Sequence, residues 1–356
     1  MELSLQKELT DIIHRIKPLD QVAMQESKIH WDQIAKPLGS LGKLETNIIQ
    51  IAGMQRTARV DLAKKALVVM CADNGVVEEG VTQAGQEVTA IIAENFLDEK
   101  SCVALMCKDT RTDIFPIDIG MAVDTKRVEK RKIAYGTKNI VKDDAMTRQE
   151  ALRAIVTGVE VARRLGDAGY QIIATGEMGI GNTTTSSAVC AVLLHMEVER
   201  VTGRGAGLSS EGLIRKTNVI KSAIQNRRPN PKDPIDVLAK VGGFDIAGLV
   251  GVYLGGAEKK IPVVIDGFIS AVAALIAIRI CPQASDYILA SHISSEPAGI
   301  LLLEEMKKDP CLICDMCLGE GTGAVALFPL LEMGLHIYNK MSTFEEIKIE
   351  NYKPFN

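Results

Sequence analysis

The feature that most constrains the fold is a short apolar run that recurs along the chain and ends each time in a polar or glycine-rich turn. The runs are KALVVMCADNG, TDIFPIDIG, YQIIATGEMGIGN, IPVVIDGF, DYILASHISSE and CLICDMCLGEGTG. Stretches with helical patterns lie between them, among them TTTSSAVCAVLLHM and ISAVAALIAIRI. Alternation of this kind predicts βαβ units. The chain should therefore form an α/β, Rossmann-like, doubly wound and mainly parallel sheet.

The polar ends of these runs predict where a ligand binds. In an open parallel sheet, ligands occupy the crevice outside the carboxyl ends of the strands. All six runs place a polar side chain at that edge: Asp73, Asp118, Glu177, Asp266, His292 and Glu320. Residues that are far apart in the sequence thus become one candidate site.

Both ends of the chain lack the strand pattern. Residues 5–16 have apolar side chains at helical spacing, and residues 44–54 and 328–338 also read as helices. We predict a small helical domain built from residues 1–60 plus 331–356, and a large α/β catalytic domain at residues 61–330.

Composition argues against several classes of protein. The net charge is −4 without a block of like charges, and aromatic residues make up 4% of the chain, so we expect no nucleic-acid partner. Apolar stretches are all interrupted before they reach membrane-spanning length, and the N-terminus is not a signal peptide. Eight cysteines without a secretion signal indicate reduced thiols and a cytoplasmic location.

Two glycine loops could contact an anion. Residues 176–183 form a strand-to-helix turn, with Asn182 and the following threonines as helix caps, and backbone N–H groups at such a helix start bind phosphate well. The same pattern also fits a purely structural turn. The loop at 203–207 has Leu208 where a dinucleotide fingerprint would continue, but Arg204 and Lys216 lie nearby.

Glu320 is the strongest candidate for a catalytic base. It follows an apolar run and is wrapped in glycines, so few side chains surround it and partial desolvation should raise its pKa. The alternative is a glutamate in a surface turn, and the position at the ligand edge of the sheet favours function.

Cys311, Cys314 and Cys317 have the spacing of metal ligands, but no fourth cysteine and no histidine pair accompanies them. We interpret CLICDMC as the last strand of the sheet, with its thiols packed as small core residues. No metal site and no cofactor are expected. A metal-dependent regulator is the rival that these thiols would support. A nicotinamide-dependent oxidoreductase is a second rival, but CADNGV is not the glycine turn that it requires.

Several long motifs, in order, resemble one enzyme family. They are KPLGSLGKLE, ADNGVVEEGVTQAGQEVT, GEMGIGNTTTSSA, GRGAGL with RKTNVI, GGFDIAGLVG, VVIDGFISAVAA and LGEGTGA. Together they resemble nicotinate-nucleotide–dimethylbenzimidazole phosphoribosyltransferases. These enzymes move ribose 5-phosphate from nicotinate mononucleotide to 5,6-dimethylbenzimidazole, for the nucleotide loop of cobalamin. The resemblance implies a homodimer with a Rossmann-like large domain, and Glu320 as the catalytic base.

The resemblance also implies roles for other residues. Glu177 and Lys216 match polar positions of the family's active site, and Gln86 matches a glutamine beside its base pocket. The expected 5′-phosphate site comprises Gly179, Gly181, Asn182 and Thr183, with the loop of Gly203, Arg204 and Gly205 close by. Asp266 would bind a ribose hydroxyl or orient its neighbours.

The chain departs from the family pattern near the presumed base pocket. Asn74 stands where the family often has histidine, and Gly85 where it often has proline. The preferred base is therefore open between dimethylbenzimidazole, other benzimidazoles, adenine and phenolics.

Overall fold

The fold is that of a computed structural model, which describes residues 2–352. Its strands are β1 (Lys65–Ala72), β2 (Thr112–Gly120), β3 (Glu129–Lys130), β4 (Ile172–Met178), β5 (Val263–Ile265) and β6 (Ile288–Ala290). They form one sheet in the order β3-β2-β1-β4-β5-β6, with every neighbouring pair parallel. This is the strand order of a doubly wound dinucleotide-type fold, and the predicted α/β class is confirmed.

Helices connect the strands and cover both faces of the sheet. The α-helices are α1 (Glu2–Arg15), α2 (Gln21–Gln33), α3 (Lys43–Gln55), α4 (Glu87–Phe96), α5 (Cys102–Asp109), α6 (Arg148–Asp167), α7 (Asn182–Leu194), α8 (Val198–Val201), α9 (Ser210–Arg227), α10 (Pro234–Val241), α11 (Phe244–Lys259), α12 (Phe268–Ile280), α13 (Gly299–Glu305) and α14 (Thr322–Lys340). Two 3₁₀ segments, η1 (Gly75–Glu79) and η2 (Pro282–Tyr287), complete the set for the described chain.

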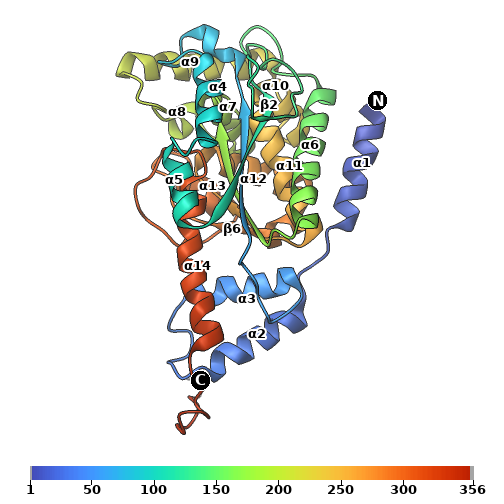
Figure 1. The fold of residues 1–356 in the computed structure, drawn as a ribbon. Helices are drawn as coiled ribbons and strands as arrows, with labels where there is room; N and C mark the ends of the chain where they lie inside the picture. Colours follow the sequence, from blue (N-terminus) through green and yellow to red (C-terminus); the bar gives the residue numbers. More distant parts are fainter. Residues whose placement is uncertain (1, 353–356) are drawn as a thin grey trace.

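The two helical layers explain why the strands read as continuous apolar runs. Helices α11 and α12 pack on the strands, with α6 against α11, whereas α4, α5 and α14 also contact strands. Figure 1 shows α6 and α11 on one side of the sheet and α5 and α14 on the other. All eight residues of β1 are buried, as expected for a parallel sheet covered on both faces.

The chain ends meet below the sheet. Helices α2 and α3 pack together, and α14 reaches down to α3 (Figure 1). The buried indole of Trp31 lies 5.1 Å from the ring of Tyr338, and Ile34 forms a backbone bridge with Thr343. Helix α1 does not pack with α2 and α3 in this way; it lies beside the sheet and contacts α6 and α11. The domain boundaries at residues 60 and 330 stay a prediction.

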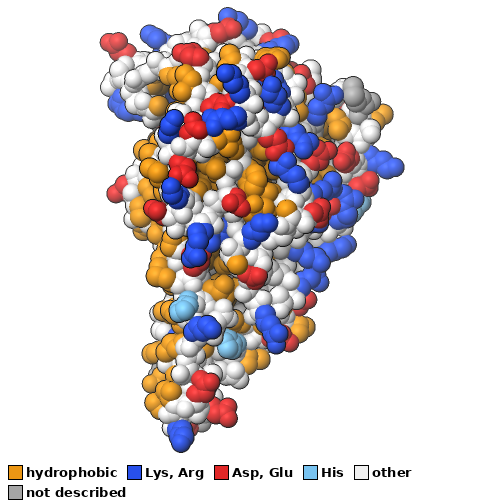
Figure 2. Space-filling model, viewed as in Figure 1, with side chains coloured by type: hydrophobic (Ala, Val, Ile, Leu, Met, Phe, Trp, Pro, Cys, Tyr) orange, Lys and Arg blue, Asp and Glu red, His pale blue; other side chains and the backbone are white. Residues whose placement is uncertain are grey.

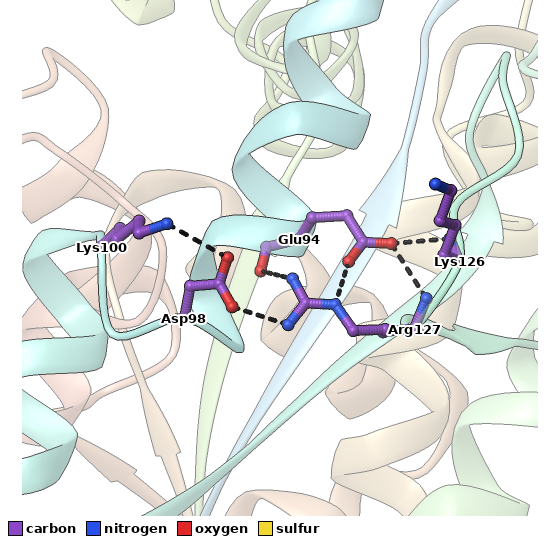
Figure 3. A network of polar contacts seen from close by, with 5 residues as sticks. All are labelled: Glu94, Asp98, Lys100, Lys126 and Arg127. Atoms are coloured by element: carbon purple, nitrogen blue, oxygen red, sulfur yellow. Dashed lines mark hydrogen bonds and ion pairs between the residues drawn. The ribbon is translucent and has the colours of Figure 1, made fainter.

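A surface network fixes the segment between β2 and β3. Arg127 donates to the Glu94 carboxylate of α4 (2.8 Å) and to Asp98 (2.6 Å), while Lys100 pairs with Asp98 (Figure 3). The backbone N–H groups of Lys126 and Arg127 also donate to Glu94. Since these groups are partly exposed, each ion pair contributes little stability. Their combined effect is to attach this connection to α4, near the carboxyl end of β2.

Candidate active site

The predicted ligand edge of the sheet is hollow. A cavity of about 360 Å³ opens there. It is lined by residues that follow β4, β5 and β6, by the start of α7, by Gly205 and Ala206, and by residues 317–320. Of the predicted site residues, Glu177, Gly179, Asn182, Thr183, Gly205, Asp266 and Glu320 line it. The strand order reverses between β1 and β4, so the cavity lies beside the topological switch point of the sheet.

Glu320 reaches the cavity from a strained turn. Gly319, Glu320 and Gly321 all have positive φ, at 83°, 63° and 95°. A left-handed conformation costs a non-glycine residue about 1–2 kcal/mol, so the fold holds Glu320 in place against a local preference. Its Oε2 atom is buried and has no hydrogen-bond partner among the described residues. Burial, and then the nearby Asp266 carboxylate, raise the pKa of Glu320.

Asp266 anchors this turn. Its Oδ2 accepts from the backbone N–H of Gly321 (3.0 Å), and its Oδ1 accepts from Gly323 (2.7 Å) and Ala324 (3.2 Å). These N–H groups belong to the start of α14, where the helix leaves its donors without intrahelical partners. Asp266 therefore ties the end of β5 to the turn that carries Glu320.

The segment before Glu320 corrects a prediction. Residues 313–319 have no regular secondary structure, and the segment makes a single parallel bridge, Leu312 to His292, beyond β6. Ile313 is 77% exposed, and Cys314 and Cys317 are also exposed. CLICDMC is thus not a strand, and only Cys311 is partly covered, by Asn47, whose amide donates to its thiol. Asp315 in a left-handed conformation breaks the extended run.

Glu177 is a further buried carboxyl group of the cavity. It lies near the end of β4, and Asn182 Nδ2 donates to its Oε2. Burial, and next the Asp245 carboxylate, raise the pKa of Glu177 well above its usual range. The hydrogen bond also corrects the predicted cap, because Asn182 turns inward and the N-cap of α7 is Gly181, without a side-chain cap.

A lysine cluster, Thr183, Gly205 and Lys216, lies at another part of the site. Lys216 is fully buried, and its Nζ donates to Thr183 Oγ1 (2.9 Å) and to the carbonyl of Gly203 (3.1 Å). Burial lowers the pKa of Lys216 to about 8. Thr183 and Gly205 face the cavity in front of this ammonium group. Together with the first turn of α7, the cluster offers donors to an anion.

Arg204 does not join this cluster. Its guanidinium is exposed and donates to the carbonyl of Leu208 and to Ser210, so it stabilises its own loop.

Gln86 also lies outside the main cavity. It lines an adjoining pocket of about 500 Å³ together with Thr82 and Tyr135, and its Nε2 donates to the carbonyl of Asn74 (3.3 Å). Ala84 lines both hollows, so the two are neighbours.

Glu296 is a site residue that sequence reasoning missed. It lines the cavity, its Oε2 is buried without a partner among the described residues, and its charge acts on Lys216. A Cβ atom at position 203 would lie 1.8 Å from Glu296 Oε2 and 2.8 Å from Pro297 Cδ, so any larger residue there would displace the Glu296 side chain from its place in the site. The segment GRGAG (203–207) thus packs closely against SSEPAG (294–299), which explains why position 203 is a glycine.

The comparisons with known proteins agree with this geometry. A phosphoribosyltransferase family model matches residues 16–349. The chain is 48% identical, over 97% of its length and 98% of the relative, to the nicotinate-nucleotide–dimethylbenzimidazole phosphoribosyltransferase of Ruminiclostridium cellulolyticum. It is 46% identical, over 95% of both chains, to the enzyme of the same name from Acetivibrio thermocellus. The crystal structure of CobT from Thermus thermophilus superposes with a TM-score of 0.88, at 37% identity, over 93% of this chain and 99% of that one.

The chain belongs to the nicotinate-nucleotide–dimethylbenzimidazole phosphoribosyltransferase family. The resemblance carried by the motifs is therefore confirmed. For a member of this family, the cavity at the strand ends is the candidate active site. A larger groove, of about 1230 Å³, lies elsewhere, among α2, α3 and the C-terminal segment. It is mostly apolar, lined by Trp31, Leu38 and Ile349, and its buried carboxylate, Glu45, is already paired with Lys36.

Two further findings bear on this family site. His292, noted from the sequence at the end of a strand, is buried beside the cavity, where burial lowers its pKa and Asp266 opposes that effect. Within residues 2–352, no group of three or more histidine, cysteine or acidic side chains has an arrangement that could hold a metal ion.

Proposed function

We propose that this chain transfers ribose 5-phosphate from nicotinate mononucleotide to 5,6-dimethylbenzimidazole or a related base. The products are α-ribazole 5′-phosphate and nicotinate, with inversion at C1′, for the nucleotide loop of cobalamin. Family membership supports the reaction. The observation that carries it is Glu320, which lines the cavity at the strand ends and has one carboxylate oxygen buried without a partner among the described residues.

The reaction needs a base but no general acid. When the bond from C1′ to the pyridinium nitrogen breaks, its electron pair stays on nitrogen, so nicotinate leaves without taking a proton. The attacking benzimidazole nitrogen forms the new bond to C1′ and makes the ring cationic. The proton on the other ring nitrogen must then leave. A carboxylate at that position takes the proton and stabilises the charge as it develops.

Glu320 suits the role of this base. Its side chain lines the cavity, and no hydrogen bond to the described residues competes for its carboxylate when the N–H group of the incoming ring arrives. Its raised pKa brings its proton affinity closer to the working pH, which favours proton transfer. The anchored turn keeps the carboxylate in a fixed place, as positioning catalysis requires.

The charges around the cavity match the charges of the reacting groups. The ionisable side chains that line it are those of Glu177, Asp266, His292, Glu296 and Glu320. A carboxyl-rich wall stabilises positive charge on a ribosyl centre or on the new benzimidazolium ring. The 5′-phosphate would lie at the lysine cluster, where α7 begins and Lys216 supplies a cation behind Thr183.

The base pocket sets which ring is accepted. We assign it to the region between Glu320 and the adjoining pocket of Gln86, where Asn74 and Gly85 depart from the family pattern. Asn74 is fully buried and accepts from Thr185, so it supports the pocket from behind. We expect dimethylbenzimidazole to react, and comparison of kcat/KM for benzimidazoles, adenine and phenolics measures the preference.

We also expect a homodimer that acts in the cytoplasm. An apolar surface supports the dimer: Leu105 of α5 and Met333 of α14 are about half exposed, and α5 packs against α14. Apolar side chains gather along the corresponding edge of the molecule in Figure 2. None of the helices between residues 2 and 352 combines the length and hydrophobicity that crossing a bilayer requires. Light scattering during gel filtration measures the dimer directly.

The deciding experiment is an assay with defined substrates. The purified protein is incubated with nicotinate mononucleotide and dimethylbenzimidazole, and the products are separated and identified by mass and by the anomeric proton signal. We expect nicotinate and α-ribazole 5′-phosphate in equal amounts. Release of nicotinate without a ribosylated base would indicate hydrolysis and contradict the proposal, as would the β anomer.

A further inference from the structure

A buried chain of polar groups continues behind Glu177. Asn182 Nδ2 donates to Glu177 Oε2 and also lies beside the carboxyl group of Asp245, at the start of α11. Asp245 is fully buried and does not line the cavity. Its Oδ1 accepts from the N–H of Ile246, and its Oδ2 has no hydrogen bond from a described residue. Asn182 thus separates two buried carboxyl groups.

The surroundings of Glu177 are acidic. The charged groups that act on it most are Asp245 of α11, Asp266 after β5 and Glu320 before α14, and the Cys71 thiol of β1 lies nearby. Carboxyl groups so close together in a buried space do not all ionise. Asp266 is stabilised as a carboxylate because it accepts hydrogen bonds from three backbone N–H groups. Glu320 must be ionised to serve as the base.

We propose that Asn182 and Asp245 are positioning residues for Glu177, and that Glu177 acts as a neutral carboxyl group that donates a hydrogen bond to an oxygen of the nucleotide. This inference rests on the proposed function. Oε2 of Glu177 accepts from Asn182, so its proton belongs on Oε1. Oε1 faces Gly319, where a Cβ atom would approach it to 2.6 Å, next to Glu320. The site then contains one carboxylate that takes a proton and one carboxyl group that keeps its own.

Two substitutions at Glu177 test the neutral state by activity. In Glu177→Gln, the amide oxygen accepts from Asn182 and the amide nitrogen replaces the donor at Oε1. We expect its kcat/KM to stay within about tenfold of the wild type. Glu177→Ala removes the donor and should lose at least about a hundredfold. A glutamine variant as inactive as the alanine variant, with the same melting temperature as the wild type, would overturn the inference.

Infrared titration tests the same state without turnover. The spectrum of the substrate-free wild type minus that of Glu177→Gln should show the carbonyl band of a protonated carboxyl group at pH 7. Burial raises the pKa of Asp245 to about 7, so above that pH Asp245 carries a negative charge that favours the proton of Glu177. Asp245→Asn removes this charge, and the band should then disappear at a pH lower by about one unit. The matched difference between Asp245→Asn and the double variant Asp245→Asn/Glu177→Gln isolates the Glu177 signal.

The two measurements separate this inference from the proposed function. If the carbonyl band of a protonated carboxyl group is absent at pH 7, the proposed role of Glu177 is wrong whatever the assay shows. If the band titrates at the same pH in Asp245→Asn as in the wild type, the proposed role of Asp245 is wrong. A wild-type protein that forms no α-ribazole 5′-phosphate counts against the reaction, and the infrared result still decides the protonation of Glu177.

Discussion

The carboxylate cluster (Glu177, Asp266 and Glu320) and the lysine cluster of the same cavity are built in different ways. The carboxylate cluster assembles from the ends of β4 and β5 and from the turn before α14, and its charges are crowded. The lysine cluster has a single buried cation, balanced by Glu296. The first arrangement suits charge that appears during a reaction, and the second suits a phosphate that keeps its charge throughout. Substitutions in the two clusters should therefore affect different kinetic parameters.

The largest effect is expected at Glu320. Glu320→Gln keeps the size and shape of the side chain but cannot take a proton, so kcat should fall by about 10²–10⁴-fold. The KM for nicotinate mononucleotide should change little, because the phosphate and ribose contacts remain. Steady-state kinetics with both substrates varied gives the two parameters separately. Turnover within tenfold of the wild type, in a folded variant, would remove Glu320 from the role of base.

The lysine cluster should respond in the opposite way. Lys216→Met keeps the buried stem but removes the cation behind Thr183, and the loss of its attraction to the phosphate should weaken nucleotide binding by about 10–100-fold. We expect this loss in KM, with kcat changed far less. Calorimetric titration with nicotinate mononucleotide checks it in the absence of the second substrate. A variant that binds normally but turns over slowly would assign Lys216 to the chemical step.

The pH dependence of binding follows from the same lysine. Burial lowers the pKa of Lys216 to about 8, so the cation is present below that pH and is lost above it. Affinity of the free enzyme for the nucleotide should therefore decline as the pH rises through about 8. Glu296 opposes the effect of burial. Glu296→Gln should start the decline at a lower pH, and an unchanged profile would show that the two side chains are not coupled.

A smaller effect is expected from the anchor of the Glu320 turn. Asp266→Asn loses one carboxylate acceptor and should destabilise the fold by about 1–3 kcal/mol, measured by chemical denaturation. A loosened turn should lower kcat by about tenfold and leave the KM for nucleotide unchanged. Direct contact of Asp266 with a ribose hydroxyl would raise that KM instead. The split between the two parameters thus decides which of the two expected roles Asp266 has.

The sequence specified the sheet better than it specified the turns. Runs such as KALVVM and YQIIAT are apolar because helices cover both faces of each strand. The sequence alone therefore predicted both that these runs are strands and that polar residues follow them. The two-residue strand β3 carries no such signal, because only its backbone pairing with β2 defines it. CLICDMC imitates a strand in composition but makes only one bridge beyond β6.

Predictions of site residues failed where a role depends on a distant partner. Asn182 was expected to cap α7, as asparagine often does, but it is the first residue of the helix rather than its N-cap, and its amide donates to the buried Glu177 five residues earlier. Glu296 follows the last strand in a loop of ordinary composition, and only the approach of Lys216 and Gly203 makes it part of the site. Glu320 could be found because the glycines on both sides mark it within its own segment, although the strand expected before it is absent.

The smallest effect is expected from the thiols beside the carboxylate cluster. Cys314 and Cys317 are both exposed, and of the two only Cys317 lines the cavity next to Glu320. A double Cys314→Ser/Cys317→Ser variant removes no core packing and no charge, so melting temperature should be unchanged and kcat/KM should stay within about twofold. Cys311→Ser is the matched comparison, because this thiol is partly buried against Asn47. A folded double variant with little activity would mean that a thiol, and not only carboxyl groups, takes part in the chemistry.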